Sequence, residues 1–398
     1  MRQVRPDASA SAVKRRKSKA IAAAVAIVAA LAIVIAWRGV HDEAKPAAPS
    51  RPSAFAPAAP AATSAAPTPA ALTPRARLLA AGQQVRSTSD SACTIPLPAA
   101  ASDAGPDDPA AQAALMRRPG VAGLMNATRR IDGALRASAD PFANAVAVWL
   151  DLPRTDGDSE RVPDGERQRL LATMAASTTD PRVYALAFRT CSRSSEAACQ
   201  ALSARRWAAL DPGNAVPWLF LLNDAQRARD ASGEQEAWFH VAASTRFDER
   251  FYSRLQPILA AAGDDPDDQR AAHVLSVMGI GISAAEPIGF GPLSNGCRDA
   301  ASADANRAQL CAKVADLLFD HSDAPGTRLF GASITRRLTG DTRRNEQMAK
   351  EQQFWAVNNP VAPQDCAELH RQLDFIRSLA TRGSHGTYAA MTSGVPSR

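Results

Sequence analysis

The chain has 398 residues, of which 46% are hydrophobic, 22% are charged and only 5% are aromatic, which suits a globular part of one or two domains plus non-globular segments. The net charge is +6, but residues 1–19 carry seven basic residues and one acidic residue, so the rest of the chain sums to zero. Phosphate binding requires positive charge on the folded domain, and the sequence therefore argues against a nucleic-acid-binding protein.

An uncharged apolar run follows this basic tail at residues 20–37. Its 18 residues make about 27 Å of helix, close to the roughly 30 Å apolar core of a bilayer. Because the basic residues lie mainly before the run, the positive-inside rule keeps residues 1–19 in the cytoplasm. We expect a single-pass signal-anchor in a bacterial inner membrane, with the bulk of the chain in the periplasm. A cleavable signal peptide is the alternative, but its small-residue site at 54–56 lies far downstream.

Composition separates three further parts of the chain. Residues 44–112 contain 23 Ala and 12 Pro and few large apolar residues, which is typical of a disordered linker. Residues 383–398 are rich in Gly, Ser and Thr, and we expect an unstructured tail there. In residues 113–382 apolar residues recur every three or four positions, with no alternating strand pattern, so the sequence predicts an all-α periplasmic domain. The predicted helices include 182–191, 196–210, 215–230, 234–245, 248–262, 268–278, 299–320, 326–338, 342–357 and 364–381.

Residues typical of helix ends stand at several of these boundaries. Asp180 and Asp211 each precede a proline, which fits an N-cap followed by a first-turn Pro. Gly340 fits a C-terminal cap, and Asp341 or Thr342 can cap the helix that follows.

Six cysteines lie on the exported side, where disulfides persist. The short spacings favour one disulfide between Cys191 and Cys199 and another between Cys297 and Cys311. Cys93 lies in a small apolar segment of the linker that is expected to dock on the domain through its cysteine. A zinc site would need close Cys/His pairs, which the sequence lacks, and we expect no metal or other cofactor.

Three aromatic residues recur with a period of 34 residues. Tyr184, Trp218 and Tyr252 each lie on the first helix of a predicted helix pair, and aliphatic or small residues follow three and seven positions later, on the same helical stripe. The period, the aromatic residue and the preceding Asp-Pro turns resemble a degenerate tetratricopeptide-like (or SEL1-like) repeat, over residues 181–262 only. The resemblance implies an α-solenoid-like array with these three residues in the repeat core.

The chain departs from that family where two helices would cross. Phe188, Leu222 and Gln256 stand where the family has a small residue. We therefore expect an irregular helical-repeat array. An α-helical bundle in which the aromatic residues happen to be equally spaced is the alternative.

The resemblance also implies a binding face, because the first helices of stacked repeats line a concave surface that binds peptides or partner helices. The groove positions are Arg189, Arg193, Asn223 and Arg227. Guanidinium and amide groups in this arrangement could bind a carboxylate. The alternative is that they form solvated helix faces, since the third unit has Pro257 at the corresponding position, where it would also kink helix 248–262.

A Gly-rich segment covers residues 279–296 and is expected to form a long loop. It does not fit a phosphate-binding loop, because no strand precedes it and no Gly-Lys-Ser/Thr opens the next helix. Its apolar residues, among them Phe290, make it a second candidate binding surface.

Catalytic chemistry has few candidates. Cys366, His370 and Asp374 share one stripe of a predicted helix, in the order nucleophile, base and orienting acid, but a straight stripe offers no oxyanion hole. We expect Cys366 to be half of a disulfide instead. The acidic residues available for glycoside hydrolysis are Glu236, Glu249, Glu286 and Glu368, and none stands in a motif like that of lytic transglycosylases.

These observations favour an inner-membrane-anchored periplasmic scaffold or adaptor that binds another envelope protein or peptide without catalysis. The alternative is an envelope hydrolase acting on cell-wall polymer or peptide. A signalling receptor is less favoured, because 19 cytoplasmic residues are too few for a domain.

Overall fold

The computed structural model describes Cys93 and residues 120–151, 164–192, 194–284, 286, 288–298, 304–358 and 363–393. These residues form an all-α domain, which confirms the predicted fold class: they contain fifteen helices and no β-strand. None of the described helices is long and apolar enough to span a bilayer, and the apolar run 20–37 lies outside the described residues.

The helices follow one another through short connections. They are α4 (Val121–Ala137), α5 (Pro141–Leu150), α6 (Asp164–Ser177), α7 (Pro181–Cys191), α8 (Ala197–Gln200), α9 (Ala204–Leu210), α10 (Ala215–Ala228), α11 (Ala231–Ala243), α12 (Leu255–Ala261), α13 (Pro266–Ala284), α14 (Gly291–Gly296), α16 (Ala305–Asp320), α17 (Pro325–Thr339), α18 (Arg343–Asn358) and α19 (Cys366–Thr392).

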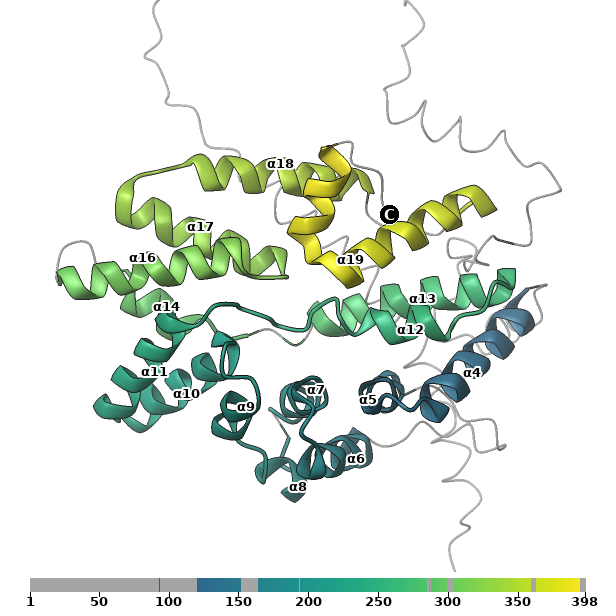
Figure 1. Ribbon diagram of the computed structural model, residues 1–398, viewed down its shortest axis with the longest axis horizontal. Coiled ribbons are helices and arrows are strands. Elements are labelled where there is room, and N and C mark those ends of the chain that lie inside the picture. The colour runs from purple at the N-terminus through teal and green to yellow at the C-terminus, as the bar shows by residue number, and fades with distance from the viewer. Residues whose placement is uncertain are drawn as a thin grey trace, which may run out of the picture.

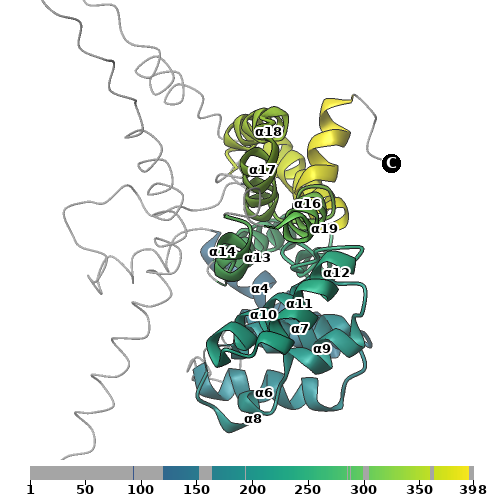
Figure 2. The same cartoon turned by 90° about the vertical axis from the view of Figure 1, so that its left-hand side faces the viewer.

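The helices stack in three tiers, which Figures 1 and 2 show from two directions. Helices α5 to α11 form the lower tier, α12 and α13 cross the middle, and α16 to α19 form the upper tier (Figure 1). Helix α4 packs on both α5 and α13, and α13 packs on α19 in turn. Helices α10 and α11 form one antiparallel hairpin, and α16 and α17 form another that contacts α11.

A continuous apolar core runs through the tiers, anchored by large aromatic residues. Trp149, Trp207 and Trp238 are each at most 1% exposed. Burying a large apolar side chain contributes about 1.5–3 kcal/mol, so a few such residues can support a domain poor in aromatics. Trp207 also fixes the packing of three helices, because its ring lies 5.5 Å from Phe188 of α7 and 6.0 Å from Phe220 of α10.

Helix capping agrees with the sequence at Asp180 and differs at Asp211. Asp180 accepts a hydrogen bond from the Arg182 N–H at 2.7 Å, with a proline in the first turn of α7. At α10 the N-cap is Asn214, which accepts from the Val216 N–H at 3.1 Å. Asp211 instead accepts from the Asn214 amide, because its buried carboxylate also pairs with arginines of the segment after α11.

The third predicted repeat unit differs from the structure. Helix α12 covers only Leu255–Ala261, so Tyr252 lies in the turn before the helix and not on it. Side chains from elsewhere bind the N–H groups of this turn, which a helix would need for itself. Starting at Leu255 also places Pro257 in the first turn, where a missing N–H is tolerated.

The Gly-rich segment is mostly helical, in contrast to the long loop that we predicted. Helix α13 continues through Gly279 to Ala284, and α14 begins at Gly291. A Cβ on Gly279 would lie 3.3 Å from Leu255 and 3.6 Å from the Trp149 ring. This glycine therefore allows close packing of helices and does not mark a turn.

The C-terminal segment also differs from the expected unstructured tail. Helix α19 changes direction at Gly383, which has φ +67°, and continues to Thr392. Ser384 is fully buried, and both its N–H and its hydroxyl donate to the carbonyl oxygen of Asp323. Residues 384–392 thus pack on the domain.

Three disulfides join all six cysteines. Cys191–Cys199 and Cys297–Cys311 are the pairs that their spacing favours. The third disulfide links Cys93 to Cys366 at the start of α19 and spans 273 residues. Three disulfides in one domain indicate an oxidising, extracytoplasmic location.

Because a cross-link restricts the unfolded chain more when it closes a longer loop, the three disulfides should differ in their contribution to stability. Changing Cys93 and Cys366 together to Ser should lower the free energy of unfolding by about 2–5 kcal/mol. The same change at Cys191 and Cys199, only 8 residues apart, should cost less. Urea denaturation of the two double variants measures this, and an equal or larger loss at Cys191/Cys199 would contradict it.

The α16–α17 hairpin depends on one glycine. A Cβ on Gly331 would lie 2.9 Å from the Ala315 carbonyl oxygen, from the Leu318 Cβ and from the Phe319 nitrogen, so the two helices touch at this residue. The contacted atoms belong to backbone and Cβ and cannot move aside as a flexible side chain could.

Gly331→Ala should therefore destabilise the protein by about 1–3 kcal/mol through overpacking. Gly326→Ala in the same helix is the matched control, because a methyl group added there would have nothing within 4 Å, and it should be neutral or stabilise by up to about 1 kcal/mol. Thermal denaturation of both variants measures the difference, and equal melting temperatures would refute the close contact.

Candidate functional site

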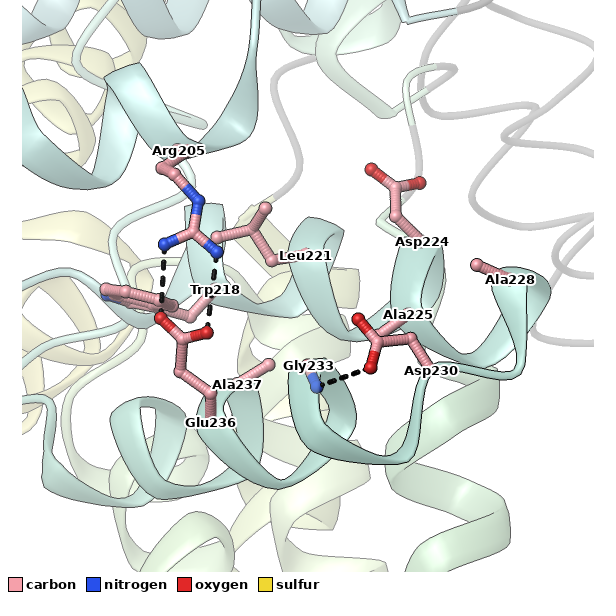
Figure 3. Close-up of a pocket in the computed structure, with 10 residues that line it drawn as sticks. All are labelled: Arg205, Trp218, Leu221, Asp224, Ala225, Ala228, Asp230, Gly233, Glu236 and Ala237. Atoms are coloured by element: carbon pink, nitrogen blue, oxygen red, sulfur yellow. Dashed lines mark hydrogen bonds and ion pairs between the residues drawn. The ribbon is translucent and has the colours of Figure 1, made fainter.

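A half-open cleft of about 230 Å³ lies along the α10–α11 hairpin, with one residue contributed by α9. Figure 3 shows the side chains that line it. We call it the α10–α11 cleft; its lining residues are Arg205, Trp218, Leu221, Asp224, Ala225, Ala228, Asp230, Gly233, Glu236 and Ala237.

Small residues keep the two helices of the hairpin close and make room for the cleft. Ala225 and Ala228 of α10 face the cleft together with Gly233 and Ala237 of α11. A Cβ on Gly233 would lie 3.4 Å from the Ala225 Cβ and closer still to the Asp230 carboxylate. Trp218 and Leu221 add larger apolar surface, so the lining is apolar in its middle.

Charged side chains surround this apolar lining. The Arg205 guanidinium binds both carboxylate oxygens of Glu236, at 3.1 and 3.4 Å. This hydrogen bond lowers the pKa of Glu236 and raises the pKa of Arg205. Asp230 caps α11 by accepting from the Gly233 N–H at 3.0 Å, and Asp224 pairs with Arg227 at 2.5 Å.

A row of aromatic rings leads out of the cleft along α11. The Trp218 indole stacks on the His240 ring with centroids 3.8 Å apart, and His240 contacts the Phe239 ring at 5.5 Å. Phe239 is 63% exposed, which is unusual for an aromatic side chain in a soluble domain. Exposed aromatic residues beside an apolar recess are typical of protein-binding surfaces.

The structure separates the predicted groove residues. Arg189 is 4% exposed and donates to the carbonyl oxygens of Glu249, at 2.5 Å, and Glu286. Asn223 donates to the carbonyl oxygen of Gly289 at 3.1 Å, and thus links α10 to the segment before α14. Arg227 is exposed and pairs with Asp224 beside the cleft. Arg193 lies outside the described residues.

The predicted surface and core aromatics take different places. Phe290 stacks between Phe247 and Phe330, at 6.1 and 4.7 Å, so it joins the tiers. Tyr184 is fully buried in α7, and its hydroxyl donates to the carbonyl oxygen of Ser203 at 3.2 Å. Tyr252 is also buried, whereas Trp218 lines the cleft.

A buried polar cluster lies where the tiers meet, formed by Arg189, Glu249, Arg254, Glu286, Asp323 and Thr327. Arg254 is 1% exposed and binds the Glu286 carboxylate at 2.8 Å while its guanidinium lies over the Trp149 ring at 4.8 Å. The Thr327 hydroxyl donates to the Glu249 carboxylate. Asp323 accepts from the N–H groups of Glu249 and Phe251 at 3.1 and 2.9 Å. Every carboxylate of the cluster is engaged within the domain.

Burial perturbs the acids of this cluster. Although Asp323 as a residue is half-buried, its carboxylate is enclosed, and this burial raises its pKa to about 7, with the nearby carboxylates of Asp248 and Glu249 adding to the shift. Burial also raises the pKa of Glu249, against the opposing effect of Arg189.

The catalytic candidates are held in structural contacts. Cys366 is oxidised in its disulfide with Cys93, so it carries no thiolate, and Asp374 pairs with Arg377 at 2.8 Å. His370 is exposed on α19. Glu368 accepts from the Gln364 N–H at 2.9 Å, near the start of the same helix. In the described part of the chain, no group of three or more His, Cys, Asp or Glu side chains could hold a metal ion.

Comparisons of the chain with protein-family profiles, with curated proteins and with solved structures find no match. They identify neither a family nor a repeat.

Sequence reasoning singled out only Trp218 among the cleft residues, and for its period, not for binding. Arg205 and Glu236 lie 31 residues apart, and neither stands in a motif. The available signal was the Ala and Gly content of the two helices together with Phe239 on the polar side of a predicted helix.

The raised pKa of Asp323 makes stability depend on pH. The folded protein keeps a proton on Asp323 up to about pH 7, whereas the unfolded chain loses it near pH 3.8, so this contribution to stability is lost as pH rises through 7. We expect the free energy of unfolding to fall between pH 6 and 8.5, by at most about 1.4 kcal/mol per pH unit from this group. Buried His273, whose pKa burial lowers, acts in the opposite sense below its ordinary pKa.

Asp323→Asn isolates the contribution of this carboxyl group. The variant should be less stable than the wild type at pH 6, because the amide nitrogen cannot accept a main-chain N–H. Its disadvantage should shrink toward pH 8.5, while Asp316→Asn on the exposed face of α16 leaves the profile unchanged. Urea denaturation across this range measures both, and parallel profiles for Asp323→Asn and wild type would show that Asp323 does not titrate there.

Proposed function

We propose that the protein is a membrane-anchored adaptor of the cell envelope that binds a segment of another protein or a peptide in the α10–α11 cleft. The observation that carries the proposal is the cleft itself, an apolar recess with a charged rim beside the exposed ring of Phe239.

The size of the cleft favours a protein segment over a small molecule. Small-molecule sites are commonly about 300–1,000 Å³ and enclose most of the ligand. At about 230 Å³, with one side open, the α10–α11 cleft matches a single inserted side chain. The rest of the bound segment would then lie across the hairpin and contact Phe239.

The fold supports a scaffold role in the form of an irregular helical-repeat array. Helices α6 and α7, α10 and α11, and α16 and α17 pack as successive pairs, and Tyr184 and Trp218 lie on the first helices of their predicted units. The apolar run 20–37 supplies the proposed anchor in the inner membrane, and the disulfides support exposure of the domain on the far side.

Photo-crosslinking tests this function in the intact chain. A p-benzoyl-phenylalanine at Phe239 should give one discrete adduct in cells that express the full-length protein, because the ring there would contact the partner. The same probe at Val357 of α18, which is 81% exposed, is the control and should give none.

A second substitution links the adduct to the cleft. Leu221→Asp, combined with the probe at Phe239, should reduce the adduct several-fold by placing a charge in the apolar lining. The same adducts from Phe239 and Val357, or an adduct that Leu221→Asp leaves unchanged, would contradict binding at the cleft.

A further inference from the structure

We propose that the side chain entering the α10–α11 cleft is cationic, a Lys or Arg of the bound segment, and that it binds Glu236 in place of Arg205. The inference rests on the proposed function and adds the chemistry of the partner.

The lining suits a long side chain with a charged end. Trp218, Leu221 and Ala237 offer an apolar surface on which the methylene groups of Lys or Arg can pack. The carboxylates stand at the rim, where the charged end of such a side chain would arrive (Figure 3). A purely aliphatic guest would cover those carboxylates without compensating their lost hydration.

The charge balance of the lining selects the sign of the guest. Three carboxylates, those of Asp224, Asp230 and Glu236, face a single guanidinium, that of Arg205. Asp224 has a further partner in Arg227, but that pair is loose in solvent, with side chains 60% and 76% exposed. An acidic guest would be repelled by this excess of negative charge, whereas a basic one is attracted.

Arg205 shows within the protein which group the rim accepts. Its guanidinium comes from α9 and reaches across to Glu236, which belongs to α11, so a cation already stands beside Trp218 and Leu221 (Figure 3). The Arg205 side chain is 65% exposed and that of Glu236 is 42% exposed. Exposed ion pairs of this kind contribute little to stability, so a guest cation can displace Arg205 at small cost.

The displacement gives the two partners of one ion pair opposite roles. Glu236 is the acceptor for the guest, and its loss weakens binding. Arg205 is the competitor of the guest, and its loss strengthens binding. A purely structural ion pair would not produce effects of opposite sign.

Fluorescence anisotropy with four labelled peptides tests the proposal on the full-length protein in detergent. The peptides share the sequence Ala-Leu-X-Leu-Ala, with Lys, Arg, Gln or Glu at the central position. We expect the Lys and Arg peptides to bind more tightly than the Gln and Glu peptides, and their affinity to fall as salt is added.

The substitutions Glu236→Gln and Arg205→Gln supply the decisive comparison. Glu236→Gln should weaken binding of the Lys peptide about three- to fivefold, and Arg205→Gln should strengthen it by a similar factor. Asp374→Asn, which removes an exposed pair with Arg377 on α19, is the matched control and should change nothing. Circular dichroism and urea denaturation of each variant establish that the fold is retained.

Several outcomes would overturn the proposal. Tightest binding of the Glu peptide, or weaker Lys-peptide binding by Arg205→Gln, would show that Arg205 receives an anionic guest. Equal binding of all four peptides, or of none while the Phe239 adduct still forms, would remove the cationic guest and leave the adaptor function standing. Loss of both peptide binding and the adduct would overturn the two proposals together.

Discussion

The carboxylate of Asp323 makes the interaction on which the relative placement of the tiers depends. It accepts the main-chain N–H groups of Glu249 and Phe251, while the carbonyl oxygen of the same residue accepts from Ser384. One residue thus holds the turn before α12 and the second half of α19 against the start of α17. Enclosed polar groups are costly unless they are hydrogen-bonded, so removing one member of this set leaves another without a partner.

The α10–α11 cleft is tied to the same framework. Asn214, the N-cap of α10, accepts from the Asp248 N–H and donates to the Asp248 carbonyl oxygen, so the base of the hairpin is fixed to the turn that Asp323 holds. The alanines and Gly233 then set the spacing of the two helices. A recess held in this way is preorganised, which lowers the ordering cost of binding and allows a small surface to recognise a guest.

The sequence was informative where local patterning decides the structure, as in the all-α class and the bounds of α7, α10 and α17. It failed where a distant residue decides. The turn before α12 has a helical pattern, but its N–H groups bind Asp323, 74 residues later for the first of them. Gly279 is typical of a loop, but Trp149 packs against it within a helix. The cleft was missed because Arg205 and Glu236 acquire meaning only when three helices bring them together.

The link between Cys93 and Cys366 also determines how a mechanical load would enter the domain. Residues 20–37 and 44–92 precede Cys93, so tension from a membrane attachment would pass through this covalent bond into the first turn of α19. The stretch between Cys93 and α4 would carry none of that force while the bond is intact. The protein would then be held by its C-terminal helix, although its attachment is at the N-terminal end of the chain.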